Sequence, residues 1–400
     1  MAPTQEELLY KALSDLACPR YPFRNQVSQH IDNLASEYYQ WIDADCDFTS
    51  QSARAAYKRH RLSDIAARAF PSLTLEELRP VARFTSSLAI IDDFLDKADV
   101  GELEQVCHRT TALLLGVDEN EPPSKGFFHQ VYLVRQDALA CGMPPHLYEQ
   151  FVDAIAGLLT GYGAEKRYNA ADTPPPLNTY IMLRRQTSGG LCYAKYLCMQ
   201  KNYRRLPDDV LRHPAILRMH ELVSLLIGYH NDFISLPKEL ARGGDVINLV
   251  MVVQQEFGLS TLSQAWVRAL AIHDDALREL IRLQVNLPDF GPWQQMATEY
   301  AADLGVMVQG VYMWHINKTG RYVPGAYVEP VYCPAPARME SKQDQGPLED
   351  QPRPKLPPRG RVLAPSQDIV GILFCGTLFC VLLLFLLFVP HRPTDEEALQ

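Results

Sequence analysis

The spacing of apolar residues over most of the chain is the feature that most limits its fold. Between residues 4 and 319 apolar side chains recur at intervals of three and four, as at Leu222, Leu225 and Leu226, and this spacing is typical of helices that bury one face. The sequence has no long alternating run of β-branched residues that would predict strands. Breaks rich in Pro, Gly and Asp divide the region into roughly ten helices. We therefore predict an all-α fold, with one large helical bundle over residues 1–322 whose interior can hold a site.

The chain after the bundle differs in composition. Prolines concentrate in residues 323–368 among charged and polar residues, which predicts a disordered Pro-rich linker. Residues 369–389 carry no charge and are rich in Leu and Phe, and their length suits one transmembrane helix, which needs about 20 residues. More Lys and Arg precede this helix than follow it in the short tail, residues 390–400. This bias predicts a single-pass membrane anchor with the bundle in the cytosol, on the endoplasmic reticulum in a eukaryotic cell.

Composition excludes some classes of function. The net charge is −9 and no basic cluster interleaved with aromatic residues is present, so we expect no nucleic-acid partner. The nine cysteines include no C-x-x-C pair, which is typical of thiols in a reducing compartment. The acidic start at Glu6 and Glu7 lacks the basic and apolar segments of a signal peptide. A homodimer is one form of assembly that the sequence allows.

Three carboxylates interrupt an apolar helical run at Asp92, Asp93 and Asp96. Asp92 and Asp96 share one helical face, where they repel each other unless a cation lies between them. Carboxylate oxygens are ligands that Mg²⁺ prefers, commonly together with substrate phosphates. Taken alone, the pattern is equally compatible with a solvated helix end.

A second polar face occurs further along the chain, where Asn231, Ser235 and Glu239 follow each other at intervals of four. Their amide, hydroxyl and carboxylate oxygens project from one side of a helix and suit a second metal position. Lys238 is placed to bind a phosphate. The alternative is an ordinary helix N-cap signal. Pro237 requires that the helix bend there or end shortly afterwards.

An arginine pair precedes a break in a helical region. Arg184 and Arg185 are followed by Ser188, Gly189 and Gly190, and each glycine costs a helix about 1 kcal/mol. A break at this point frees carbonyl groups and allows a neighbouring helix to approach closely. The alternative for the arginines is an exposed surface pair.

Together, the order and spacing of these motifs resemble those of the class I terpene synthases of the microbial, chiefly fungal and bacterial, sesquiterpene cyclase type. The resemblance covers roughly residues 74–325. It implies metal ligands at Asp92, Asp96, Asn231, Ser235 and Glu239; diphosphate-binding residues at Arg185, Lys238, Arg321 and Tyr322; and effector and linker positions at Ser188 and Gly189. The resemblance assigns Arg185 to the diphosphate because this residue precedes Asn231 by 46 positions (231 minus 185). At Ser188 many bacterial relatives carry an acidic residue, so the coupling of the break to the arginine is expected to differ.

The resemblance also implies the chemistry. Three Mg²⁺ ions, two arginines and a lysine stabilise the leaving diphosphate of a linear prenyl diphosphate, with farnesyl diphosphate (C15) favoured, and the carbocation cyclises to a sesquiterpene hydrocarbon or alcohol. Apolar aromatic walls stabilise such a cation. The candidates are Phe84, on the face of Asp92, and Trp314, on the helix that leads to Arg321. Either aromatic residue would also suit a plain core.

Two alternatives remain. A prenyl-chain elongating transferase shares the helical cavity and the Mg²⁺ chemistry, but such enzymes carry two DDxxD motifs and this chain has one. A catalytically inactive, membrane-anchored helical scaffold is the other alternative. It is disfavoured because all the expected ligand types are present.

Overall fold

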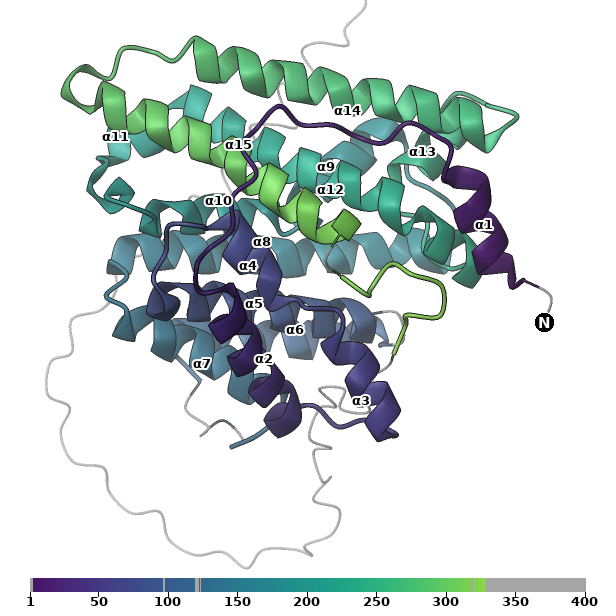
Figure 1. Ribbon diagram of the computed structural model, residues 1–400, viewed down its shortest axis with the longest axis horizontal. Helices are drawn as coiled ribbons and strands as arrows, with labels where there is room; N and C mark the ends of the chain where they lie inside the picture. Colours follow the sequence, from purple (N-terminus) through teal and green to yellow (C-terminus); the bar gives the residue numbers. More distant parts are fainter. Residues whose placement is uncertain (1–2, 96–97, 119–121, 123, 318, 329–400) are drawn as a thin grey trace, which may run out of the picture. The chain divides into compact units, whose positions relative to one another are not determined.

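The computed structural model describes residues 3–95, 98–118, 122, 124–317 and 319–328. All regular elements of these residues are helical, which confirms the predicted all-α class (Figure 1). The α-helices are α1 (Gln5–Leu13), α2 (Ile31–Asp45), α3 (Gln51–Lys58), α4 (Ser63–Ala69), α5 (Leu75–Leu95), α6 (Val100–Leu115), α7 (Phe127–Ala140), α8 (Pro145–Ala170), α9 (Leu177–Thr187), α10 (Gly190–Tyr196), α11 (Asp208–Leu211), α12 (Pro214–Arg242), α13 (Leu249–Glu256), α14 (Leu262–Val285) and α15 (Gln294–Asn317). Short 3-10 helices lie at η1 (Leu197–Met199), η2 (Tyr203–Arg205) and η3 (Gly291–Trp293).

The chain separates into two units, Met1–Met339 and Glu340–Gln400. The second unit, with the predicted transmembrane helix 369–389 and the tail 390–400, lies outside the described residues, as does most of the predicted linker. Among the described residues no helix is both long and apolar enough to cross a membrane. Residues 323–328, which the sequence analysis assigned to the linker, contact the bundle: the backbone N–H of Gly325 donates to Glu6 Oε2 at 3.1 Å.

Helix α12 is the element around which the site is built. It packs against α1, α9, α10, α14 and α15 (Figure 1). Pro214 occupies its first turn, and the His213 side chain caps it by accepting a hydrogen bond from the backbone N–H of Ala215 at 3.2 Å. It continues past Pro237 and ends at Gly243, which has φ 69°. Of the two alternatives for Pro237, the structure therefore has the helix ending shortly afterwards.

Helix α5 carries the first acidic motif at its C-terminal end. A reciprocal pair of hydrogen bonds between Thr74 and Glu77 begins the helix, with distances of 3.1 and 3.3 Å. The C-terminal end of a helix has a partial negative charge, so carboxylates such as Asp92 and Asp93 are unfavourable there without a cation. The local structure thus requires positive charge opposite the end of α5.

The predicted break falls between α9 and α10. Gly189 has φ 77°, a left-handed conformation that favours glycine. At Gly190 a Cβ atom would lie 2.5 Å from the Cα of Ser224, so only glycine lets α10 approach α12 this closely. The break also frees the Arg185 carbonyl, which accepts a hydrogen bond from Ser224 Oγ at 2.6 Å. Both predicted consequences of the break, a close helix contact and a freed carbonyl, are present.

Candidate active site

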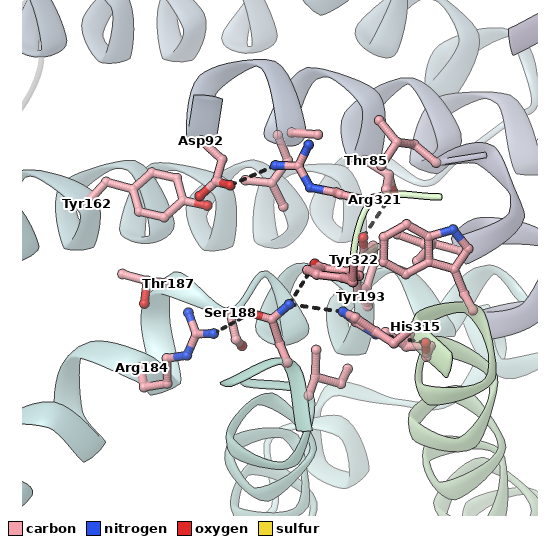
Figure 2. Close-up of a pocket in the computed structure, with 18 residues that line it drawn as sticks. Thr85, Asp92, Tyr162, Arg184, Thr187, Ser188, Tyr193, His315, Arg321 and Tyr322 are labelled. Atoms are coloured by element: carbon pink, nitrogen blue, oxygen red, sulfur yellow. Dashed lines mark hydrogen bonds and ion pairs between the residues drawn. The ribbon is translucent and has the colours of Figure 1, made fainter. Parts of the chain in front are cut away.

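A cavity of about 120 Å³ lies between α4, α5, α8, α9, α10, α12 and α15 and is also lined by residues of the turn after α15 (Figure 2). Part of its wall is apolar and aromatic, and part carries charge. The apolar and aromatic lining comprises Leu62, Ile65, Leu88, Ala89, Tyr162, Tyr193, Ile227, Val311, Trp314 and Tyr322. The polar lining comprises Thr85, Asp92, Arg184, Thr187, Ser188, Asn231, His315 and Arg321. The lining therefore combines charged groups that suit a polyanion with apolar groups that suit a hydrocarbon chain.

The end of α5 is paired with Arg321. Its guanidinium donates to Asp93 at 2.8 and 3.1 Å and to Asp92 Oδ2 at 3.1 Å. Arg321 and Asp93 are buried, whereas the Asp92 side chain is 55% exposed and lines the cavity (Figure 2). Asp92 thus keeps carboxylate surface available to a ligand, and Asp93 holds Arg321 in place. Asp96, the third residue of the motif, lies outside the described residues.

A second arginine, Arg184, faces the cavity from the opposite wall (Figure 2). It donates to Asn231 Oδ1 at 2.8 Å and to Asp232 Oδ1 at 2.6 Å. Gly228 makes room for it, because a Cβ at this position would lie 2.8 Å from Arg184 Cγ. The site therefore holds two cationic groups, each already paired with a residue of one of the two motifs.

Arg185, the predicted diphosphate-binding arginine, lies outside the cavity lining. Its side chain is partly exposed, donates to Glu221 at 2.7 Å and does not line the cavity. Helical geometry gives the reason: Arg184 follows the buried Tyr180 by four positions and precedes the buried Thr187 by three, so it shares their inward face. The spacing from Asn231 predicts Arg185 as the diphosphate-binding arginine. The pattern of burial along α9 instead places Arg184 at the cavity.

Asn231, Ser235 and Glu239 lie on one side of α12, as predicted, but they differ in their exposure to the cavity. Asn231 lines the cavity, and Ser235 and Glu239 are buried. Ser235 Oγ lies close to the Glu239 carboxylate without forming a hydrogen bond of good geometry, and one oxygen of Glu239 accepts from Asn248 Nδ2 at 2.7 Å. A buried hydroxyl without a partner is costly, and a cation held by these oxygens would satisfy it.

The carboxyl groups around this end of α12 influence one another. Burial raises the pKa of Glu239, against the opposing effect of Lys238. Burial also raises the pKa of Asp245 to about 7, with further increases from Glu239 and then from Asp92. The α5 carboxylate of Asp92 is thus close enough to Asp245, which follows α12, to raise its pKa. Divalent cations between the two motifs would remove that repulsion.

Lys238 and Tyr322 lie beside this triad. The Lys238 ammonium is 5.8 Å from the centroid of the Tyr322 ring. The Tyr322 hydroxyl lines the cavity and accepts a hydrogen bond from Asn231 Nδ2 at 2.8 Å. Ser188, at the helix break, also lines the cavity, and its Oγ donates to the Ser224 carbonyl at 2.8 Å. The structure therefore brings Lys238, Tyr322 and the break to the same site.

The two predicted aromatic wall residues have different positions. Trp314 lines the cavity and is fixed by hydrogen bonds from its Nε1 to the carbonyls of His60 and Arg61, at 3.1 and 2.9 Å. Phe84 is not part of this lining. Its ring packs in the core against Phe151 and Tyr193, with centroids 5.4 and 6.0 Å away. In place of Phe84, Tyr193 presents an aromatic face to the cavity.

Four residues of the site were not predicted from the sequence: Arg184 as the inward arginine, Tyr193, Gly228 and His315. Tyr193 and His315 come from buried faces of α10 and α15, where aromatic residues are also common in plain cores. No signal in the sequence distinguishes these two from core residues. The inward orientation of Arg184 likewise follows from the burial of Tyr180 and Thr187 in the structure, and the sequence alone does not contain it.

Comparison with known proteins identifies the class. Residues 83–279 match the model of terpene synthase family 2, C-terminal metal binding. The chain is 26% identical over 311 residues to a germacrene A synthase from Nostoc punctiforme, covering 76% of this chain and 92% of that protein. It is 26% identical over 310 residues to a (+)-T-muurolol synthase ((2E,6E)-farnesyl diphosphate cyclizing) from Roseiflexus castenholzii, covering 76% and 93%.

The fold agrees with this class. The solved structure of hedycaryol synthase in complex with nerolidol has a TM-score of 0.61 at 18% identity, and the match covers 75% of this chain and 99% of that one. The chain belongs to the class I terpene synthases. Within that class it is of the microbial and fungal type, a family described as metal-binding.

Proposed function

We propose that this protein binds farnesyl diphosphate with Mg²⁺, ionises it and cyclises the carbocation to a sesquiterpene hydrocarbon or alcohol, releasing diphosphate. One observation carries the proposal. Arg321 pairs with Asp92 and Asp93 on one wall, and Arg184 pairs with Asn231 and Asp232 on the other, with the cavity between them. Metal ligands and cations thus converge on one polar region, next to an apolar region that suits a hydrocarbon chain. The choice of farnesyl diphosphate is supported by the relative whose name specifies that substrate.

The oxygen atoms at the site fit magnesium. Asp92 would hold metal on one wall, and Asn231, Ser235 and Glu239 on the other; all are hard oxygen donors. The Ser235 hydroxyl, which lies close to Glu239 without a hydrogen bond of good geometry, supports this fit. Bound Mg²⁺ would stabilise the charge that develops on the leaving diphosphate. Three ions, with Asp96 as a further ligand, are expected from the resemblance to the family.

The protein's own groups then have distinct roles. Arg184 and Arg321 are always charged and present planar donors that suit phosphate oxygens. Each can exchange its carboxylate or amide partner for the diphosphate, with Lys238 and the Tyr322 hydroxyl as further donors. Charge stabilisation of this kind is strongest in a site that excludes water. Arg321 and Tyr322, from the turn after α15, line the cavity.

The inner wall suits the cation that remains. Trp314 and Tyr193 present aromatic faces there, and Tyr162 lies close to Asp92 near the polar end (Figure 2). A cation over an aromatic face is stabilised by about 0.5–2 kcal/mol. Because hydrogen bonds to two carbonyls hold the Trp314 ring, its orientation is fixed. The shape of this wall, in our proposal, selects among the possible ring closures.

Incubation of the protein with Mg²⁺ and each of the C10, C15 and C20 prenyl diphosphates tests the activity. Cyclic hydrocarbons or alcohols from the C15 substrate, detected by gas chromatography and mass spectrometry, are the expected products. A longer prenyl diphosphate that forms only when isopentenyl diphosphate is added would reject this function in favour of chain elongation. No turnover of any substrate would favour the inactive scaffold.

We further propose that residues 369–389 anchor the enzyme to a membrane as a single helix, with residues 329–368 as its tether. The proposal rests on the uncharged, Leu- and Phe-rich sequence of 369–389 and on the basic residues before it. Truncation after Asp368 is expected to move the protein from the membrane pellet to the soluble fraction. If the truncated protein still sediments with membranes, the anchor is elsewhere. Homodimer formation stays a prediction.

A further inference from the structure

His315, on α15, lines the cavity beside Trp314 and Tyr322, although no motif in the sequence marks it. It is buried, and its Nδ1 lies 3.0 Å from the carbonyl oxygen of Val311 in the preceding turn. A carbonyl oxygen can only accept a hydrogen bond, so Nδ1 must carry the proton. In the neutral ring the other nitrogen, Nε2, then has a free lone pair and acts only as an acceptor.

The acceptor Nε2 of His315 lies 3.0 Å from the side-chain amide of Asn231. The amide group facing it must therefore be the donor Nδ2 and not the carbonyl oxygen. The second hydrogen of Nδ2 points to the Tyr322 hydroxyl at 2.8 Å, and Oδ1 accepts from Arg184 at 2.8 Å. Both hydrogens and one oxygen lone pair of the amide are thus used.

A rotation of the amide by 180° would reverse these interactions. The carbonyl oxygen would then face the lone pair of His315 Nε2, and the NH₂ group would face the guanidinium of Arg184. Two attractive contacts would become two repulsive ones. The side chain of Asn231 therefore has a single preferred orientation, with Oδ1 on the side of Arg184.

We propose that His315 is a positioning residue, which holds the Asn231 amide so that its oxygen, and not its nitrogen, is presented to the metal. The inference rests on the proposed function, in which Asn231 is a metal ligand. The carbonyl oxygen has two lone pairs, so it can coordinate a cation while one lone pair accepts from Arg184. An amide nitrogen cannot replace it, because it has no lone pair to offer. Residues that orient metal ligands in this way typically contribute about 10- to 100-fold to metal affinity.

The test is binding of Mn²⁺ in the presence of inorganic diphosphate, measured by electron paramagnetic resonance on the full-length protein. His315→Phe keeps a ring of similar size but removes the acceptor, so we expect the Mn²⁺ dissociation constant to rise about 10- to 100-fold. His315→Gln retains a side-chain oxygen that can accept from Asn231, and it should restore much of the affinity. His220→Phe is the matched control: His220 is also buried, lies on α12 and bonds Tyr300 at 2.8 Å, but it does not line the cavity. Its Mn²⁺ affinity should equal that of the wild type.

A double-variant experiment separates positioning from packing. In Asn231→Asp both terminal atoms of the side chain are oxygens, so no amide orientation has to be set. Adding His315→Phe to this background should cause much less further loss than it causes in the wild type. Equal losses in the two backgrounds, or wild-type Mn²⁺ affinity in His315→Phe, would overturn the positioning role alone. If the wild type binds no Mn²⁺, the metal site itself is wrong and the proposed function fails with it. Should His315→Phe not fold, His315→Leu and His315→Gln provide the same comparison of absent and present acceptor.

Discussion

Arg321 and Asp93 form a buried ion pair through two hydrogen bonds, of 2.8 and 3.1 Å, although they are 228 positions apart in the sequence. The pair joins the end of α5 to the turn that follows α15. Asp92, the neighbouring residue, shares the same guanidinium at 3.1 Å but keeps its side chain 55% exposed. Two adjacent carboxylates thus have different structural positions, and this difference can be tested.

Asp93→Asn should mainly lower the stability of the protein, whereas Asp92→Ala should mainly abolish its turnover. Asp93→Asn leaves the buried Arg321 guanidinium without its main counter-charge, so the free energy of unfolding should fall by about 3 kcal/mol. Asp92→Ala removes a half-exposed partner, so stability should change by less than about 1 kcal/mol while turnover is abolished. Urea denaturation and product assays distinguish the two. Normal turnover in Asp92→Ala would mean that the metal assignment is wrong.

Lysine substitutions at the arginine pair test which arginine meets the diphosphate. Lysine keeps the charge but not the planar pair of donors. Arg184→Lys should lower kcat/KM about a hundredfold, as expected for a lost donor to developing negative charge. Arg185→Lys, whose partner Glu221 lies outside the cavity lining, should be close to wild type in kcat/KM. The reverse result would restore Arg185 as the diphosphate-binding residue.

Product selectivity should depend on Trp314 and much less on Phe84. Trp314→Leu removes an aromatic face from the cavity, so the ratio of products should change, together with a fall in kcat. Phe84→Leu alters the core and should lower the melting temperature while the ratio of products stays the same. Gas chromatography of the products from both variants provides the measurement. A changed ratio in Phe84→Leu alone would reverse the two roles.

The carboxyl group of Glu165, which is half-buried next to the site, gives the protein a pH-dependent stability. Burial raises the pKa of Glu165 to about 8, and its Oε1 accepts a hydrogen bond from Thr187 Oγ1 at 2.5 Å. Between pH 4.5 and 8 the folded protein thus keeps a proton that the unfolded chain releases, so this group lowers stability as pH rises. Glu165→Gln removes the effect. Its melting temperature should match wild type near pH 5 and exceed it by a few degrees at pH 8.

The control for this experiment is Glu149→Gln, on the exposed face of the same helix. Its melting temperature should stay parallel to that of the wild type across the pH range. If the difference between Glu165→Gln and wild type is constant from pH 5 to 8, Glu165 does not carry a raised pKa.

Local sequence patterns predicted much of the fold. The apolar spacing and the break at Gly189 depend on interactions within a few residues, and the structure has both of them. The positions of Asp92 and Asn231 on facing walls followed from helical periodicity combined with the family resemblance. Such features are set mainly by the chain itself.

Contacts between distant helices were not predictable in the same way. Arg184 rather than Arg185 turns inward because α9 packs against α12 at Gly228. Phe84 lies in the core because Phe151 and Tyr193 surround it, and His315 meets Asn231 only after α15 has docked on α12. Each of these positions depends on tertiary packing, which the spacing of residues along one helix does not contain.

In our proposal the two motifs form one metal-diphosphate site, and the decisive test is a crystal structure of the protein with Mn²⁺ and inorganic diphosphate. Anomalous scattering would locate the ions. We expect ions coordinated by Asp92 on one wall and by Asn231, Ser235 and Glu239 on the other. Arg184 and Arg321 should contact the diphosphate between them. Ions bound away from both motifs, or a diphosphate held without either arginine, would contradict it.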